Sequence, residues 1–310
     1  MRDFENFLKE MYEFYENLDW SYSGRKPENN EIRNKISMTA KKYGVPIFGE
    51  GTNRTVFENN GYVYKLAHKR GATYDNIGEK SNTEYIKRKH PELIPHIAEA
   101  TKYIGNEYML EEEMITPIFE FEGIDKFEGS DGERALQFLM ERADDYDYLI
   151  ELLSRAFILM DASPKSIFNY GLKTTRSRDG RRQTTLANLD YAYFVPKDGA
   201  LICPTCGNGE LKYDKIDLHY RNNQEREKII KTVKSINEEQ YVCTNEGCQH
   251  HKGGRGIAVE DVIEMYEDGQ IQTQRYQSGP GSRRGGYSSR SYERSYAGSR
   301  SGGYNDGFNR

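Results

Sequence analysis

The run GEGTNRTVF at residues 49–57 and the run VYKLA at residues 63–67 decide how the fold is interpreted. Both are rich in β-branched and aromatic residues, which favours strands. Between them lies Asn59-Asn60-Gly61, which is typical of a tight hairpin turn because Asn and Gly accept the positive φ angles that such a turn requires. The sequence therefore predicts a β-hairpin with a glycine-containing turn before it and Lys65 in its second strand.

Two later segments each place an aspartate beside an apolar run. DASPKSIF begins at Asp161, and NLDYAYF at residues 188–194 contains Asp190. Each aspartate alone is equally well explained as a residue that caps or turns the backbone. Carboxylates are also the ligands that Mg²⁺ prefers in phosphate-handling sites. Only the order of the glycine turn, the lysine strand and the two aspartate segments along the chain distinguishes functional aspartates from aspartates that cap or turn the backbone.

In that order, the features resemble the nucleotide-handling parts of the protein-kinase-like superfamily, over about residues 45–195. The resemblance implies ATP and Mg²⁺ as ligands. It implies that the backbone at Gly49 and Gly51 approaches the phosphates, that Val56 covers the adenine, and that Lys65 binds the α- and β-phosphates.

The resemblance also assigns roles in phosphoryl transfer. Asp161 would orient the acceptor hydroxyl or accept its proton, and Asp190 would hold Mg²⁺ against the β- and γ-phosphates. Ser166 stands where kinases have a metal-binding asparagine, and Asn169 lies three residues further on.

The acidic partner of Lys65 is expected on the helix that follows its strand. Glu84 is the first choice and Glu79 the second. The pattern also departs from that of protein kinases, since Arg54 replaces the third glycine and Asp-Tyr-Ala replaces Asp-Phe-Gly. The resemblance is closest to the short kinase-like proteins of bacteriophages and to small-molecule phosphotransferases.

Four cysteines occur as two close pairs, CPTCG and CTNEGC, at residues 203–207 and 243–248. Such pairs let two thiolates bind one ion from a single turn, and four thiolates complete a closed tetrahedral Zn²⁺ site of structural type. A redox pair is the alternative for the first motif, and His250 and His251 are alternative ligands. We predict zinc ligation by Cys203, Cys206, Cys243 and Cys248.

The last 35 residues, 276–310, consist mainly of Gly, Ser, Arg and Tyr, with six arginines against Glu293 and Asp306. A segment with so few aliphatic side chains is predicted to be disordered. Arginine and tyrosine both stack on bases, so binding of RNA or single-stranded DNA is one hypothesis. A solvated spacer or a self-associating segment is the other.

The composition and net charge of the chain argue against a membrane protein. The net charge is −5 and 30% of the residues are charged, with no apolar run long enough for a membrane helix, so no membrane partner is expected. The acidic, amphipathic start predicts no export peptide. We therefore expect a cytoplasmic protein, located in the host cytoplasm or the virion if it is encoded by a phage.

These observations predict an α+β fold in four parts. They are an N-terminal helical segment (1–44) expected to pack at a sheet edge, a two-lobed kinase-like domain with an antiparallel N-lobe sheet and a short helical C-lobe (45–198), a zinc ribbon (199–270) and a disordered tail (271–310). Within these parts, residue patterns predict helices at 79–90 and near 222–236, a helical stretch over 132–159 and a strand from Ile167 to Thr174. The favoured function is Mg·ATP-dependent phosphotransfer to an unidentified acceptor, with a protein as one candidate. The alternatives are a pseudokinase scaffold and a nucleic-acid-associated adaptor that acts through the ribbon and tail.

Overall fold

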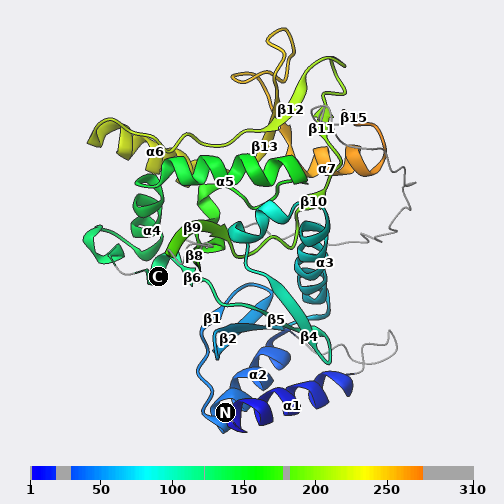
Figure 1. The fold of residues 1–310 in the computed structure, drawn as a ribbon, viewed down its shortest axis with the longest axis vertical. Coiled ribbons are helices and arrows are strands. Elements are labelled where there is room, and N and C mark those ends of the chain that lie inside the picture. Colours follow the sequence, from blue (N-terminus) through cyan, green and yellow to red (C-terminus); the bar gives the residue numbers. More distant parts are fainter. Residues whose placement is uncertain (1, 19–28, 122, 177–181, 275–310) are drawn as a thin grey trace.

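The computed structural model describes residues 2–18, 29–121, 123–176 and 182–274, which form a mixed α+β fold of antiparallel sheets and helices (Figure 1). The prediction of an α+β fold is confirmed at that level. The tail at 276–310 and the arginine-rich turn at 177–181 lie outside the described residues, so the hypotheses about them remain predictions.

The first sheet has five antiparallel strands in the order β1-β2-β3-β5-β4. The predicted hairpin is confirmed: Asn59 pairs with Tyr62, and Asn60 and Gly61 have φ angles of 55° and 79°. These positive angles explain the Asn-Gly dipeptide. The strands are β1 (Gly49–Glu50), β2 (Arg54–Asn59), β3 (Tyr62–Ala67), β4 (Ala100–Ile104) and β5 (Asn106–Glu113).

Helices α1 (Arg2–Glu16) and α2 (Asn29–Tyr43) lie below this sheet in Figure 1. We expected them at an edge of the sheet, but they cover one of its faces, because their apolar stripes meet the side chains of alternate strand residues. The shared cluster is formed by Phe4, Phe7, Met11, Tyr15, Ile32, Ile36, Ala40, Val45, Phe57, Tyr64, Leu66 and Met109.

Helix α3 (Thr73–Lys89) begins before the helix predicted at 79–90 and packs against β3, β4 and β5. Its buried side is mostly polar. Gly78 allows a close approach on this side, since a Cβ atom there would lie 2.2 Å from the carbonyl oxygen of Ala192. The helix is thereby held against the segment that follows Asp190.

The next part of the chain contains two helices, α4 (Asp131–Met140) and α5 (Ala143–Ala156), and the small strands β7 (Phe157–Ile158) and β10 (Val195–Pro196). The helical stretch predicted over 132–159 is therefore interrupted at 141–142 and ends at Ala156. A capping box between Ser130 and Glu133 sets the start of α4.

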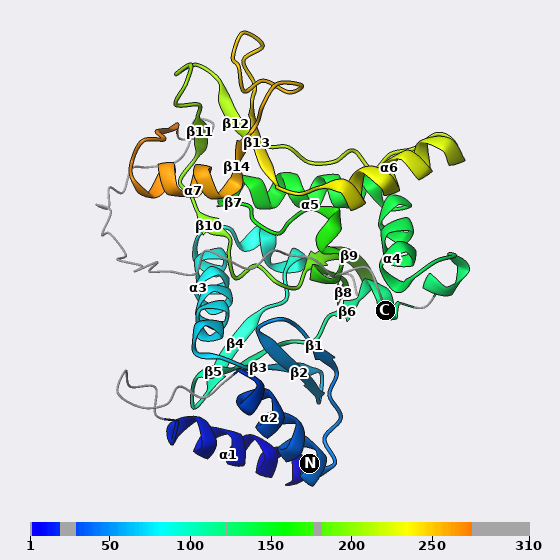
Figure 2. The ribbon, with the colours of Figure 1, turned by 180° about the vertical axis from the view of Figure 1, so that it is seen from behind.

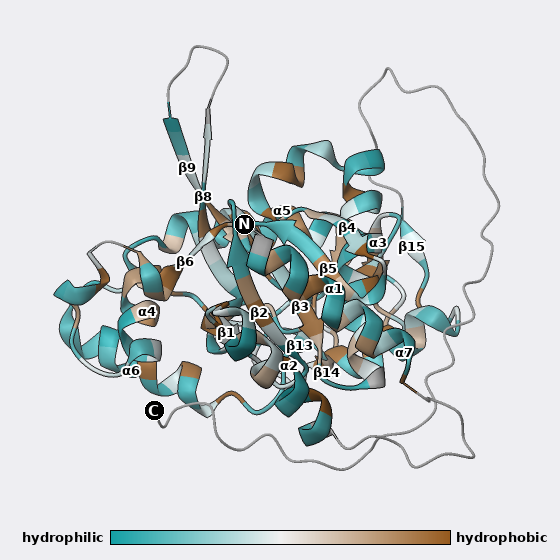
Figure 3. Ribbon diagram, turned by 90° about the horizontal axis from the view of Figure 1, so that it is seen from below, coloured by the Kyte–Doolittle hydropathy of each residue, from teal (hydrophilic) through white to brown (hydrophobic). Residues whose placement is uncertain are grey.

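A three-stranded sheet has the order β6-β8-β9, with β6 (Thr116–Pro117), β8 (Tyr170–Arg176) and β9 (Arg182–Asn188). Its β8–β9 hairpin extends away from the body of the molecule, and the outer part of β9 is hydrophilic (Figure 3). Strand β8 begins three residues later than the predicted start at Ile167, because Pro164–Asn169 form 3₁₀ turns.

The C-terminal part contains a sheet in the order β14-β13-β12-β11-β15 and two helices. Helix α6 (Asn223–Ser235) matches the predicted helix at 222–236. It lies near α4 (Figure 2), and its Lys234 pairs with Glu133 of that helix. The other elements are β11 (Ala200–Ile202), β12 (Glu210–Tyr213), β13 (Gln240–Cys243), β14 (Ile257–Ala258), α7 (Val259–Glu267) and β15 (Thr273–Gln274).

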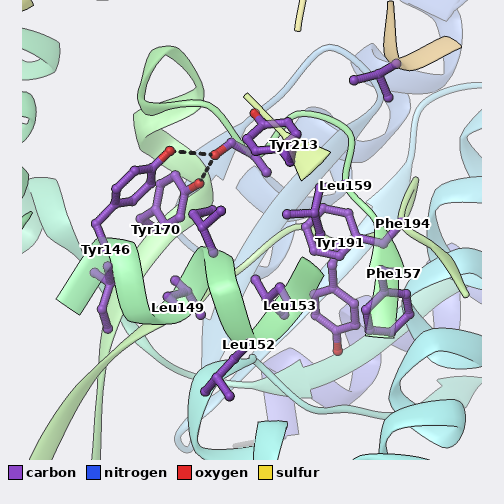
Figure 4. Packing of buried hydrophobic residues seen from close by; sticks show 14 of the residues in the cluster. Tyr146, Leu149, Leu152, Leu153, Phe157, Leu159, Tyr170, Tyr191, Phe194 and Tyr213 are labelled. Atoms are coloured by element: carbon purple, nitrogen blue, oxygen red, sulfur yellow. Dashed lines mark hydrogen bonds between the residues drawn. The ribbon is translucent and has the colours of Figure 1, made fainter. Parts of the chain in front are cut away.

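The hydrophobic core is continuous across the domain boundary expected near residue 198. One cluster joins α4, α5 and β7 to residues of the C-terminal sheet, including Leu211, Tyr213 and Tyr241. Figure 4 shows Tyr213 beside Tyr146 and Tyr170 in this cluster. In the described part of the chain, no helix combines the length and the apolar character that crossing a membrane requires.

Candidate functional site

Lys65 is buried on the face of the first sheet that α3 covers. Its Nζ atom lies 2.9 and 3.0 Å from the two carboxylate oxygens of Glu79 and 2.8 Å from Oε2 of Glu112. Nζ also donates a hydrogen bond of 2.9 Å to the carbonyl oxygen of Leu189, the residue before Asp190. The structure therefore joins the strand lysine, a helix glutamate and the second aspartate segment.

The first choice for the partner of Lys65 is wrong, and the second choice is correct. Glu79 is fully buried on α3, whereas Glu84 is exposed and pairs with Lys80 at 2.6 Å. Five residues of helix rotate a side chain by about 140° from the first position, so both glutamates cannot face the sheet.

Arg54 supplies a second buried cation at this place. Its guanidinium lies 2.9 Å from Oε1 of Glu79 and 3.0 Å from Oδ2 of Asp190, and it also lies 4.0 Å from Asp75. We define the Lys65 cluster as two cations and four carboxyl groups: Arg54, Lys65, Asp75, Glu79, Glu112 and Asp190. Arg54 is the residue that replaces the third glycine of the kinase-like pattern.

Burial and charge act in opposite directions on the carboxyl groups of this cluster. Burial disfavours ionisation of Glu79, but Arg54 and Lys65 outweigh it and lower the pKa of Glu79 to about 2. Burial raises the pKa of Asp190 against the attraction of Arg54. Oδ1 of Asp190 is buried and has no hydrogen-bond partner among the described residues. This oxygen is the group of the cluster best able to ligate a cation.

The glycine turn is folded toward α3. Asn53 donates a hydrogen bond of 2.8 Å to Oδ2 of Asp75, and Arg33 of α2 donates one to the carbonyl oxygen of Gly51. A Cβ atom on Gly49 would meet no atom within 4 Å, and one on Gly51 only the carbonyl oxygen of Arg54 at 3.7 Å. Neither glycine is therefore required by close packing within the chain.

Val56 lies directly opposite Lys65 in the β2–β3 ladder, so both side chains share the face that α3 covers. The structure therefore places Val56 next to the lysine, and its role in covering an adenine stays a prediction.

Asp161 lies in the turn after β7 and is exposed, although surrounding protein partly desolvates its carboxyl group. This desolvation, followed by the charges of Glu239 and Asp190, raises the pKa of Asp161 to about 6; Glu260 and Asp75 add smaller effects. Asp161 thus shares an electrostatic environment with Asp190, from which it is separated by 29 positions (190 − 161). A carboxyl group that titrates near neutral pH is suited to general base catalysis.

The two candidates near the asparagine position differ in what they contact. Asn169 donates a hydrogen bond of 3.3 Å from Nδ2 to the carbonyl oxygen of Asp161. Ser166 lies within the 3₁₀ turns with a non-helical ψ of 46°, and its backbone N–H donates to the carbonyl oxygen of Ser163. Asn169 therefore supports the backbone of Asp161.

The four cysteines converge as the sequence predicts. Their sulfur atoms all lie within 4.8 Å of one another, with 3.8 Å between Cys203 and Cys248 and 3.6 Å between Cys206 and Cys243. Tetrahedral zinc with Zn–S bonds of about 2.3 Å requires S···S separations of about 3.8 Å, whereas a disulfide requires about 2.05 Å. The cluster fits zinc.

The surroundings of the cysteines act on their thiols in opposite directions: burial raises the pKa of Cys243 to about 12, whereas Cys206 is favoured as a thiolate. The backbone N–H groups of Asn208 and Gly209 lower the pKa of Cys206 to about 6. The two alternative ligands are engaged elsewhere: Nδ1 of His250 contacts the carbonyl oxygen of Arg255, and Nδ1 of His251 that of Cys243. The sulfur atoms alone therefore provide the ligand set.

Two hollows lie away from the Lys65 cluster. One, of about 370 Å³, is lined by residues of the four-cysteine part such as Pro204 and Met265. The other, of about 340 Å³, lies between α1 and the β4–β5 turn and is mainly apolar. Neither hollow is lined by a residue of the Lys65 cluster, in which the Arg54 side chain contacts Glu79 on α3 and Asp190.

Comparison with protein-family models finds none that matches the chain, and comparison with curated proteins finds no similar sequence. The functional argument therefore depends on the residues themselves. Arg54, Asp75, Glu112 and Glu239 were not predicted from the sequence. Arg54 had one signal, since a bulky cation within a glycine-containing turn needs an explanation.

Proposed function

We propose that the Lys65 cluster and Asp161 form the site of a divergent kinase-like phosphotransferase that binds Mg·ATP. The observation that carries the proposal is the position of Lys65, whose ammonium group contacts both Glu79 on α3 and the backbone beside Asp190. A lysine oriented by a helix glutamate next to a metal-binding aspartate is the arrangement that phosphoryl transfer uses to hold a triphosphate.

In this proposal each residue has one task. Lys65 binds the phosphates, and Asp190 holds Mg²⁺ through Oδ1, which has no hydrogen-bond partner within the described ranges. The metal would neutralise charge on the β- and γ-phosphates. Asp161 accepts the proton of the acceptor hydroxyl, for which its raised pKa is suited. Gly49 and Gly51 leave room for the phosphates because no packing contact within the chain requires a glycine there.

Arg54 favours a second candidate, the catalytically inactive pseudokinase. Its guanidinium occupies Oδ2 of Asp190 and neutralises Glu79, so the chain already supplies a cation where a nucleotide-bound metal would act. An active enzyme has to move Arg54 or use it as a phosphate ligand. A pseudokinase scaffold would keep Arg54 in contact with Asp190.

Calorimetric titration of ATP, with and without Mg²⁺, distinguishes these two candidates. We expect Mg²⁺-dependent binding that Lys65→Ala and Glu79→Gln abolish and that Glu84→Gln, on the exposed side of the same helix, leaves unchanged. Transfer of γ-labelled phosphate that Asp161→Ala removes would establish catalysis. Binding without transfer would favour the pseudokinase, and equal behaviour of Glu79→Gln and Glu84→Gln would contradict both.

A further inference from the structure

The backbone around Asp161 is held by residues that come from the four-cysteine part of the chain. Leu159 N–H donates a hydrogen bond of 2.8 Å to the hydroxyl of Tyr241. Glu239 accepts two, from Ser163 N–H at 2.7 Å and from Ala162 N–H at 3.4 Å. Three of the amides that flank Asp161 therefore depend on Glu239, which directly precedes β13, and on Tyr241 within that strand.

The other side of the same turn is fixed from within the core. The carbonyl oxygen of Ala162 accepts hydrogen bonds from the hydroxyls of Tyr146 and Tyr170, as Figure 4 shows. The Nζ atom of Lys165 adds a hydrogen bond of 2.7 Å to the carbonyl oxygen of Ile236, four residues before Gln240. The turn thus contacts the chain that leads into β13 at several points.

This support has a conformational reason. Asp161 has a φ angle of 56°, in the left-handed region that residues other than glycine rarely adopt. Such a conformation persists only where the surrounding structure determines it, and it is common at functional sites. The hydrogen bonds to residues 159, 162 and 163 hold the backbone on both sides of Asp161, while the side chain itself remains exposed.

The position of Glu239 depends in turn on the cysteines. Glu239 directly precedes β13, and the last residue of that strand, Cys243, pairs with Leu211 of β12. The carbonyl oxygen of Glu239 accepts a hydrogen bond of 3.1 Å from Val259 at the start of α7. A metal bound by Cys243 together with Cys203, Cys206 and Cys248 would tie the end of β13 to two other segments.

From these contacts we propose that Glu239 is a positioning residue for Asp161, and that metal binding at the four cysteines maintains this contact through β13. This inference rests on the proposed function, since it assigns the four-cysteine part a role in phosphotransfer. A structural zinc site would then be a component of the catalytic centre, because it shapes the turn that carries the base.

Amide hydrogen exchange of the zinc-loaded full chain tests the contact without reference to activity. In Glu239→Gln we expect exchange at residues 159–163 to become at least about 10-fold faster, as expected for lost hydrogen bonds to a charged group. Exchange in β2 and β3 should not change. The matched control is Glu238→Gln, which alters the exposed neighbour. Unchanged exchange of the Asp161 turn in Glu239→Gln would overturn the proposal.

Steady-state kinetics distinguish a positioning role of Glu239 from a merely structural one. Glu239→Gln should lower kcat about 10-fold or more and leave KM for ATP unchanged, because Lys65 and Asp190 are not altered. Equal loss in kcat and in ATP affinity would indicate general disruption and would contradict a positioning role. If Glu239→Gln fails to fold, Tyr241→Phe, which removes the hydroxyl that accepts from Leu159 N–H, replaces it in both measurements.

Removal of zinc with a chelator tests the second part of the proposal. We expect faster exchange at residues 159–163 in the stripped chain, reversed when zinc alone is added back. A turn that stays protected after the metal has been shown to leave would overturn the role of the cysteines. If the wild-type protein neither binds ATP nor transfers phosphate, the proposed function fails, and exchange still decides whether Glu239 holds the turn.

Discussion

The Lys65 cluster and the four-cysteine site each bring several acidic groups close together, but they differ in the source of the compensating positive charge. The Lys65 cluster gathers four carboxyl groups, but the chain supplies Arg54 and Lys65 as counter-charges. The four cysteine sulfur atoms lie within 4.8 Å of one another, so thiolates there repel one another until a cation is bound. The two cations neutralise part of the carboxyl charge in the first site, so a metal there has to compete with Arg54 for Asp190. The second has to acquire its positive charge from a metal.

Loss of a cysteine should therefore have the largest effect. Cys243→Ser removes one of four zinc ligands, and we expect stoichiometric zinc to be lost and Tm to fall by roughly 10 °C or more, because structural zinc binding contributes directly to folding. Metal analysis and calorimetry measure both. His250→Ala should retain the zinc. Full zinc content in Cys243→Ser would contradict the four-thiolate site.

Removal of the Arg54 guanidinium should leave the Lys65 cluster more dependent on a bound metal for positive charge, like the cysteine site. Arg54→Gln leaves Glu79 and Asp190 without their shared partner, and we expect a loss of about 3–5 kcal/mol in the free energy of unfolding. Millimolar Mg²⁺ should restore part of this loss in the variant and have little effect on the wild type. Arg155→Gln, which breaks an exposed pair with Glu151, should cost less than about 1 kcal/mol.

An Arg54→Gln variant that is as stable as the wild type, or that gains nothing from Mg²⁺, would show that Arg54 does not stand in for a metal. Chemical denaturation with and without Mg²⁺ provides the comparison.

Substitutions at Gly78 and Gly51 distinguish a glycine that is needed for packing from one that is needed for ligand binding. At Gly78 a Cβ atom would meet the backbone of Ala192 at 2.2 Å, so Gly78→Ala should cost about 1–3 kcal/mol of stability. At Gly51 there is space, so Gly51→Ala should leave Tm nearly unchanged and weaken ATP binding. Equal ATP affinity of Gly51→Ala and wild type would remove the glycine turn from the site.

The smallest expected effect is on the pH dependence. The pKa of Asp161 is raised to about 6, and the base is its ionised form. The rate of phosphotransfer should therefore fall as the pH decreases through about 6, whereas an unperturbed aspartate would keep the rate constant to about pH 4. Neutralising its neighbour in Glu239→Gln should move this limb to lower pH. A limb that is the same in both proteins would show that another group titrates.

Local signals in the sequence predicted the parts of the fold that depend on neighbouring residues. The hairpin follows from Asn60-Gly61, and the cysteine site follows from two short spacings. The sequence does not single out Glu79, because the buried side of α3 carries polar residues such as Asn76 and Asn82 and a search for an apolar stripe does not find the helix face.

The contacts of Arg54 and Glu239 could not be predicted from the sequence for a different reason. Arg54 contacts Asp190, and Glu239 contacts Ser163. The partners in each pair are more than 75 positions apart in the sequence. No spacing within either segment encodes the distant partner. The same is true of the core shared across residue 198, which makes the expected zinc ribbon part of the structure that supports Asp161.

A crystal structure of the full chain with Mg²⁺ and a non-hydrolysable ATP analogue tests the central claim most directly. We expect a metal ion on Oδ1 of Asp190, the triphosphate against Lys65 and the glycine turn, and Arg54 displaced from Asp190 or bound to phosphate. A nucleotide bound elsewhere, or a Lys65 cluster unchanged at saturating nucleotide with Arg54 still on Asp190, would contradict a phosphotransferase site.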